Sequence, residues 1–171
     1  MNQSQQKQTL LRWLESHRGI IYKVVRAYAY QAQDQEDLFQ EIATQLWKAA
    51  PRFRGEAKES TFVYQVSLYA ALSWTRKERR RKEDPAELND SDQVLFQTCE
   101  DQPDPRLDWL YECIHKLDES DRSLTLLLLD GLSHREIAEI MGISANNVGV
   151  KLLRIKRKLT NLLERENNHE L

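Results

Sequence analysis

Apolar side chains recur every three or four residues along this chain of 171 residues, and that spacing constrains the fold more than any other feature. Because an α-helix has about 3.6 residues per turn, the spacing places apolar side chains on one face of a helix. Only 5 glycines and 4 prolines interrupt the pattern. No strand pattern and no internal repeat emerges. The sequence therefore predicts an all-α fold.

Three helices are expected in the first half of the chain. The face that the first helix should bury consists of Leu10, Leu14, His17, Ile21, Val24 and Tyr28. The second helix should run from about residue 34 to residue 50, bury Leu38, Ile42 and Leu46, and end at Pro51. The third should begin near residue 60. Its expected buried positions are Phe62, Val66, Tyr69 or Ala70, and Ser73 or Trp74.

Charge divides the chain into three parts. Residues 1–82 hold 15 Lys and Arg against 8 Asp and Glu, whereas residues 83–105 hold 8 acidic residues and no basic one. That acidic stretch also contains three prolines and little apolar sequence, which is typical of a linker. Residues 106–171 are nearly balanced, with 10 basic and 11 acidic residues. We therefore expect two small helical domains, 1–82 and 106–171, joined by an acidic flexible linker, 83–105.

Local signals in the second domain predict a helix-turn-helix, after helices near 107–116 and 120–130. Ser133 and Glu136 form a capping box, S-x-x-E, that begins a short helix. Gly142 suits the left-handed position at its end, and Ser144 can cap the next helix. Small Ala138 would allow the two helices to cross closely. The alternative is a solvated surface helix in an unrelated bundle.

The second helix of this motif should enter the major groove of DNA by its N-terminal end. Residues 142–158 carry cations and amides without one carboxylate, which indicates an anionic partner. Val148, Leu152, Ile155 and Leu159 form its apolar face. The side chains expected on the DNA side are Asn146, Asn147, Lys151, Arg154 and Lys158.

A second candidate site for nucleic acid lies at the end of the first domain. Residues 76–82, RKERRRK, hold six cations at the end of a helix that also carries aromatic side chains. Aromatic rings can stack on unpaired bases while cations follow the phosphates. Phe53 and Arg54 precede this helix in a loop. The alternatives are a solvated charge run and, for Phe62 and Trp74, a place in the core.

Several classes of protein lack support in this sequence. Cys99 and Cys113 are too few for a disulfide framework and have no histidines at a zinc spacing. There is no glycine-rich phosphate loop, nucleophile elbow or cluster of histidine and cysteine, and Glu56 and Glu59 are expected only to solvate their loop. We expect no metal, no cofactor and no catalysis. The start of the chain lacks a signal-peptide pattern and no apolar run could cross a membrane, so a cytoplasmic location without membrane insertion is expected.

The two candidate sites together resemble a known family. Residues 34–81 resemble region 2 of bacterial RNA polymerase sigma factors, and residues 117–159 resemble region 4. A chain with only these two regions and a short linker is similar to the extracytoplasmic-function (ECF) subgroup. The resemblance implies a transcription initiation factor that binds core RNA polymerase, directs it to promoters by reading the −35 and −10 elements, and promotes strand opening.

The resemblance also implies three functional surfaces. The segment that would dock on the clamp helices of the polymerase is Asp37, Leu38, Phe39, Gln40 and Glu41. The residues implied for the −10 element, including a loop that receives a flipped base, are Phe53, Arg54, Gly55, Tyr69, Ser73, Arg76, Arg79 and Arg80. The residues implied for the −35 element are those on the DNA side of the helix-turn-helix, Asn146, Asn147, Lys151, Arg154 and Lys158.

The partners that follow are core RNA polymerase and promoter DNA, and the resemblance allows an anti-sigma factor as a third. The free protein is expected to be a monomer. The rival interpretation is a stand-alone helix-turn-helix regulator, which would use its first half for a ligand or for dimerisation on palindromic DNA.

Overall fold

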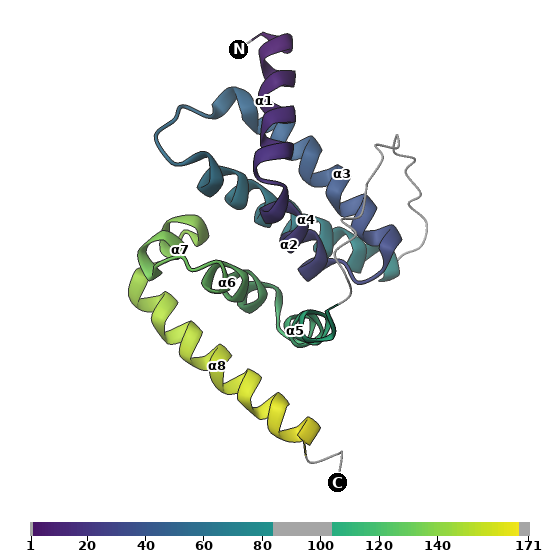
Figure 1. Ribbon diagram of the computed structural model, residues 1–171, viewed down its shortest axis with the longest axis vertical. Coiled ribbons are helices and arrows are strands. Elements are labelled where there is room, and N and C mark those ends of the chain that lie inside the picture. Colours follow the sequence, from purple (N-terminus) through teal and green to yellow (C-terminus); the bar gives the residue numbers. More distant parts are fainter. Residues whose placement is uncertain (1, 84–103, 168–171) are drawn as a thin grey trace. The chain divides into compact units, whose positions relative to one another are not determined.

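The computed structural model describes residues 2–83 and 104–167, and within them every regular element is helical. This confirms the all-α prediction. Figure 1 shows the elements in chain order. They are α1 (Gln3–Ser16), α2 (Arg18–Tyr28), α3 (Ala32–Ala49), the short 3₁₀ helix η1 (Ala50–Arg52), α4 (Glu59–Glu83), α5 (Pro105–His115), α6 (Glu119–Leu129), α7 (His134–Met141) and α8 (Ala145–Asn167).

The chain divides into two compact units, Met1–Glu100 and Asp101–Leu171. Most of the linker that the sequence predicts, 83–105, lies outside the described residues. The first unit therefore consists of α1 to α4 and the second of α5 to α8.

The first predicted helix is in fact two helices, which corrects the sequence analysis. His17 ends α1 and precedes α2 with φ −116° and ψ 21°, which is not a helical conformation. A continuous helix would place Leu10 and Leu14 in line with the buried residues of α2. The break turns the chain so that Trp13, at 0 % exposure, enters the core instead.

The core of the first unit lies where α4 packs on α2 and α3. Leu38, Ile42 and Leu46 are buried on α3 as the sequence predicts. The predicted face of α4 is wrong except at Ala70. The buried residues of α4 are Val63, Tyr64, Ser67, Leu68, Ala70 and Ala71. Small side chains at three of these positions allow α4 to approach its neighbours closely, whereas the sequence interpretation favoured bulky ones.

The second unit contains the predicted helix-turn-helix in α7 and α8. The Glu136 amide donates to Ser133 Oγ at 3.3 Å, and the Ser133 amide donates to Glu136 Oε2 at 2.9 Å, so the capping box is confirmed. Gly142 has φ +65°, the left-handed conformation that glycine tolerates best. The Asn147 amide donates to Ser144 Oγ at 3.2 Å. In Figure 1, α7 lies at the N-terminal end of the long helix α8.

Candidate nucleic-acid interface

Four of the residues expected at the −10 element form a stripe along α4. Tyr69, Ser73, Arg76 and Arg80 are separated by four, three and four residues, which places them on one face of a helix. All four are exposed, and Tyr69 retains 54 % of its accessible surface. Arg79 is also exposed and lies beside the stripe. The structure therefore presents one aromatic ring, one hydroxyl and two guanidinium groups in a line.

The loop expected to receive a flipped base is anchored at the beginning of this stripe. The Phe53 ring lies 5.0 Å from the Phe62 ring and 5.5 Å from the Trp13 ring, between centroids. Phe62 precedes Tyr69 by seven residues, or two helical turns, and so lies on the same side of α4. Gly55 adopts φ +75°, a left-handed conformation that glycine tolerates best. The loop and the stripe are thus neighbours in space.

An ion pair at the surface joins α1 to the start of α4. Arg12 Nη2 lies 2.7 Å from Glu59 Oε1, and Arg12 Nη1 donates to Glu59 Oε2 at 2.9 Å. His17 Nε2 lies 3.9 Å from the same carboxylate. Desolvation raises the pKa of Glu59, but the Arg12 hydrogen bond and neighbouring charges outweigh it, so the pKa lies below its usual value. Glu59 is therefore a structural anchor, which corrects its assignment to loop solvation.

The segment expected to dock on polymerase lies on α3, and only part of it reaches the surface. Asp37, Gln40 and Glu41 are partly exposed and share one side of the helix. Leu38 has 0 % exposure, so the structure places it in the core rather than on a docking surface. The Phe39 ring lies 6.0 Å from the Tyr22 ring of α2.

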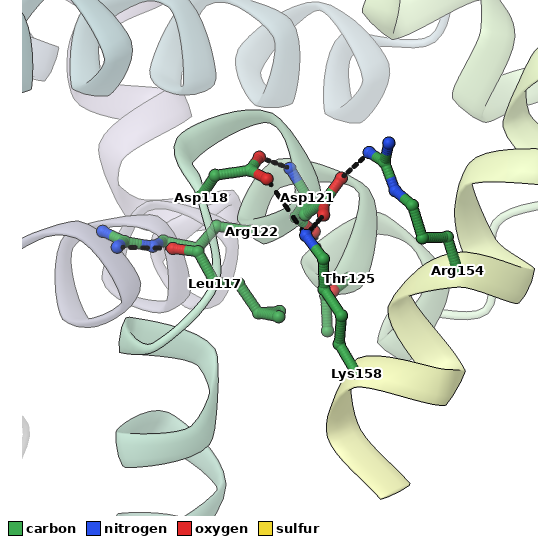
Figure 2. A network of polar contacts seen from close by, with 7 residues as sticks. All are labelled: Leu117, Asp118, Asp121, Arg122, Thr125, Arg154 and Lys158. Atoms are coloured by element: carbon green, nitrogen blue, oxygen red, sulfur yellow. Dashed lines mark hydrogen bonds and ion pairs between the residues drawn. The ribbon is translucent and has the colours of Figure 1, made fainter. Parts of the chain in front are cut away.

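The residues expected at the −35 element fall into two groups along α8. Asn146 and Asn147 are exposed in its first turn, and Lys151, partly exposed, follows one turn later. Arg154 and Lys158 lie farther along the helix, and both bind carboxylates of α6. Figure 2 shows the two side chains reaching from α8 toward Asp121.

The Asp121 carboxylate is the centre of this network. Its side chain is 1 % exposed. Arg154 Nη2 donates to Asp121 Oδ1 at 3.1 Å, and Lys158 Nζ donates to Asp121 Oδ2 at 2.5 Å. Lys158 Nζ also donates to Asp118 Oδ2 at 3.2 Å. Each oxygen of the buried carboxylate thus has a cationic donor from α8.

The network shifts the titration of two of its members. Hydrogen bonds to Asp121 and then to Asp118 stabilise the ammonium group and raise the pKa of Lys158. Desolvation raises the pKa of Asp118, but hydrogen bonds from the Asp121 amide and from Lys158 outweigh it, so the pKa lies below its usual value. Both shifts favour the charged forms of these two side chains.

Sequence reasoning missed Asp118 and Asp121 because their partners are up to 40 residues away in the chain. It also missed Arg122, whose Nη2 donates to the carbonyl oxygens of His115 and Leu117, both at 3.0 Å. These bonds close the turn between α5 and α6. A local signal existed only for Asp118, which caps α6 by accepting from the Asp121 amide.

Neither a metal cluster nor a membrane-spanning helix is seen in the part of the chain that the structure describes. Across residues 2–83 and 104–167, no three His, Cys, Asp or Glu side chains are grouped so as to hold a metal ion. The helices in the same ranges are too short or too polar to cross a bilayer.

Comparison with known families gives one answer for each unit. Residues 13–81 match the family described as Sigma-70 region 2, and residues 107–159 match Sigma-70 region 4. Together the two matches cover most of the chain. Nothing in the comparisons favours a stand-alone regulator.

Individual proteins agree with this result. The chain is 28 % identical over 142 residues to RNA polymerase sigma factor YlaC of Bacillus subtilis, covering 77 % of this chain and 80 % of that one. It is 26 % identical to the ECF RNA polymerase sigma-E factor of Haemophilus influenzae, covering 77 % and 75 %.

A solved structure shows the same fold. The sigma factor RpoE of Bartonella quintana, in complex with the anti-sigma factor NepR, is similar with a TM-score of 0.65 and 19 % identity, covering 92 % of this chain and 96 % of that one. The two helical units, in their order along the chain, correspond to the two matched regions. The chain belongs to the sigma-70 family of RNA polymerase sigma factors, in its ECF subgroup, and is a transcription initiation factor that directs RNA polymerase to promoters.

Proposed function

We propose that this sigma factor docks on core RNA polymerase through an acidic patch on α3, formed by Asp37, Gln40 and Glu41. The patch lies in a part of the chain where cations outnumber anions almost two to one. Carboxylates repel a phosphate backbone, so such a patch suits a protein partner rather than DNA. Leu38 supports the patch from the core, and Phe39 adds an apolar edge beside it.

The α4 stripe binds the −10 element in this proposal, and it is the observation that carries the assignment. Arg76 and Arg80, with Arg79 beside them, provide positive charge for the backbone, and Tyr69 offers an exposed ring on which a base can stack. Ser73 lies between them and can hydrogen-bond a base edge. A surface that combines a stacking ring with cations is suited to bind a single strand of DNA.

Strand opening then follows from binding energy alone. The loop of Phe53, Arg54 and Gly55 lies at the start of the stripe, where a base turned out of the duplex could be received. Unpairing a base costs a few kcal/mol, and each stacked base returns about 1 to 3 kcal/mol. No covalent bond in DNA is made or broken, so the chain needs neither a catalytic group nor a cofactor for this step.

The first turns of α8 read the −35 element. Asn146 and Asn147 can donate to and accept from base edges in the major groove, and Lys151 lies on the same side one turn later. Arg154 and Lys158, which the sequence places on this surface too, are bonded to α6 in the free protein. Both residues lie two or more turns beyond the N-terminal end of α8, which is the end that a helix-turn-helix inserts into the groove.

Three further statements complete the proposal. The protein works in the cytoplasm, where core polymerase and the chromosome are. It is a monomer when free. Its third partner is an anti-sigma factor, which is supported by the complex of RpoE with the anti-sigma factor NepR in the similar solved structure.

The test is run-off transcription with purified core polymerase and genomic fragments of the source bacterium. Discrete transcripts should require both proteins, and the selected promoters should share two conserved elements. Transcripts that appear with core polymerase alone, or none under any condition, would contradict the proposal.

A charge-reversed variant tests the docking patch. Asp37→Arg with Glu41→Arg should prevent co-purification with core polymerase and leave the helical content unchanged, because both side chains lie at the surface. Glu15→Arg, a charge reversal at an exposed position of α1, is the control and should bind core as the wild type does. If the double variant co-purifies at wild-type yield, α3 is not the docking surface.

A further inference from the structure

Two kinds of contact hold the recognition helix α8 against α6 and α7. Val148, Leu152 and Ile155 bury their side chains, with 0 %, 8 % and 3 % exposure. Such apolar contacts are not directional and tolerate small rotations or shifts of one helix on another. The bonds from Arg154 and Lys158 to Asp121 are directional, and they end on a side chain that is 1 % exposed.

The geometry of these bonds fixes two coordinates of α8. Arg154 and Lys158 are four residues apart, so they lie about 6 Å apart along the axis and on nearly the same side. Each binds a different oxygen of one carboxylate. A shift of α8 by one residue would turn it by about 100° and move it about 1.5 Å, which breaks both bonds. Rotation and axial position are therefore set together.

We propose that Asp121 is a positioning residue for −35 recognition. Through Arg154 and Lys158 it sets where the first turns of α8 meet the DNA. Asn147 precedes Arg154 by seven residues, which is two turns or about 10 Å along the same helix. A displacement of α8 at the Asp121 carboxylate therefore displaces Asn147 by nearly the same amount. The inference rests on the proposed function and adds one part to it: Arg154 and Lys158 act on DNA through Asp121, not by contact.

Charge supports this division of roles. A buried carboxylate left without partners is strongly unfavourable, whereas a buried ion pair often adds little net stability over apolar packing. Its best attested use in proteins is to fix a register. Arg154 and Lys158 are matched by Asp118 and Asp121, so the four side chains together are neutral. They contribute little to the positive field that attracts DNA, which leaves that role to other cations of α8.

A double-mutant cycle in the reconstituted holoenzyme tests the inference. Affinity is measured for a promoter fragment with an intact −35 element and for one in which it is scrambled. Asp121→Asn and Arg154→Met should each weaken binding to the intact promoter by roughly ten-fold, and the double variant should be no weaker than either single one. Binding to the scrambled promoter should not change. Glu139→Gln, which removes an exposed charge from α7, is the control and should match the wild type.

The alternative is that Arg154 contacts DNA itself. Arg154→Met would then weaken binding equally in the wild-type and Asp121→Asn backgrounds, and the inference would be overturned. A wild-type holoenzyme that does not distinguish the two promoters would contradict the proposed function first and the inference with it.

The salt dependence of promoter affinity distinguishes positioning from direct DNA contact even if Asp121→Asn does not fold. Each lost phosphate contact lowers the slope of log affinity against log salt concentration by about 0.9. Arg154→Met and Lys158→Met affect side chains that are 56 % and 42 % exposed, so both variants should fold. Unchanged slopes support positioning, whereas a slope lowered by about 0.9 in either variant assigns a phosphate contact and overturns it.

Discussion

The cationic helices α4 and α8 look alike in the sequence and differ in the structure. Both are long and rich in cations, which lie at the C-terminal end of α4 and in the middle of α8. Arg76 and Arg80 are exposed along the α4 stripe. Arg154 and Lys158 of α8 instead donate to a carboxylate that is 1 % exposed. A cation on a DNA-binding helix is therefore not by itself evidence of a DNA contact.

Whether a cation can contact DNA depends on whether the fold places a carboxylate beside it. The α4 stripe lies on the side of the helix opposite to its packing on α2 and α3, so its cations are available to an external ligand. The side of α8 that carries Arg154 and Lys158 faces the N-terminal turn of α6, where Asp118 and Asp121 lie. Stability should therefore be insensitive to charge on α4 and sensitive to it on α8, and promoter binding should respond in two different ways.

The largest effect is expected for charge reversal on α4. Arg76→Glu with Arg80→Glu should lower transcription on the order of 100-fold, since two cations that hold the single strand become repulsive. The free energy of unfolding should stay within about 0.5 kcal/mol of the wild type, because both residues are exposed. Run-off transcription and urea unfolding measure the two quantities. Transcription near the wild-type level would remove the stripe from promoter binding.

The opposite pattern is expected at the centre of the α8 network. Asp121→Ala should lower the free energy of unfolding by about 2 kcal/mol, because the two cations that bind its carboxylate lose their partner. The loss is smaller than for a fully buried pair, since both cations are half exposed. Urea unfolding of the wild type and the variant measures it. A variant as stable as the wild type would mean that the network has no structural role.

Aromatic residues extend the comparison to the stripe itself. Tyr69→Ala should reduce promoter opening by roughly ten-fold through the loss of a stacking surface, with little change in stability because the ring is 54 % exposed. Phe53→Ala should reduce both promoter opening and the stability of the protein, since its ring packs against Trp13 and Phe62. Permanganate reactivity of unpaired thymines reports opening.

A pre-melted promoter provides the control for these two variants. Tyr69→Ala should recover at least part of its transcription on the bubble template, where no base pair has to be opened. An equal defect of Tyr69→Ala on the duplex and on the bubble would show that the ring does not act in opening.

The smallest effect is the pH dependence of the Asp118 ion pair with Lys158. The pKa of Asp118 is lowered in the folded protein, so its contribution to stability is present above about pH 4 and is lost as the pH falls through the folded value. The pKa of Lys158 is raised, so its contribution is lost only as the pH rises through a value above about 10.4. Because both groups are partly exposed, we expect roughly 0.5 kcal/mol or less.

Asp118→Asn isolates this term, because asparagine is an equally good helix cap. The stability difference between this variant and the wild type should be present at pH 7 and absent at pH 2. A difference that persists at pH 2 would come from the cap and not from the charge.

The sequence predicts best those features whose causes are local. The capping box of Ser133 and Glu136, the left-handed Gly142 and the Ser144 cap all depend on residues within four positions of each other, and all are confirmed. Together they locate the helix-turn-helix. The buried face of α3 was also predictable, because its large apolar residues recur at the helical period.

Features that depend on distant partners could not be predicted. The buried face of α4 is set by close contact with α2 and α3 through small residues such as Ala71. The break at His17 lets Trp13 join a ring cluster with residues 40 or more positions away. The carboxylate that binds Arg154 is 33 residues away. The location of the candidate DNA-binding surfaces was therefore accessible from sequence, but the partner of each cation was not.

The most direct test of the account compares the salt dependence of promoter binding for one cation from each helix. Arg80→Gln and Lys158→Gln remove the same charge, and both holoenzymes are measured on one intact promoter. We predict that the slope of log affinity against log salt falls by about 0.7 for Arg80→Gln, the value for one single-strand phosphate contact, and is unchanged for Lys158→Gln. An unchanged slope for Arg80→Gln, or a lowered slope for Lys158→Gln, would contradict the distinction between the two helices.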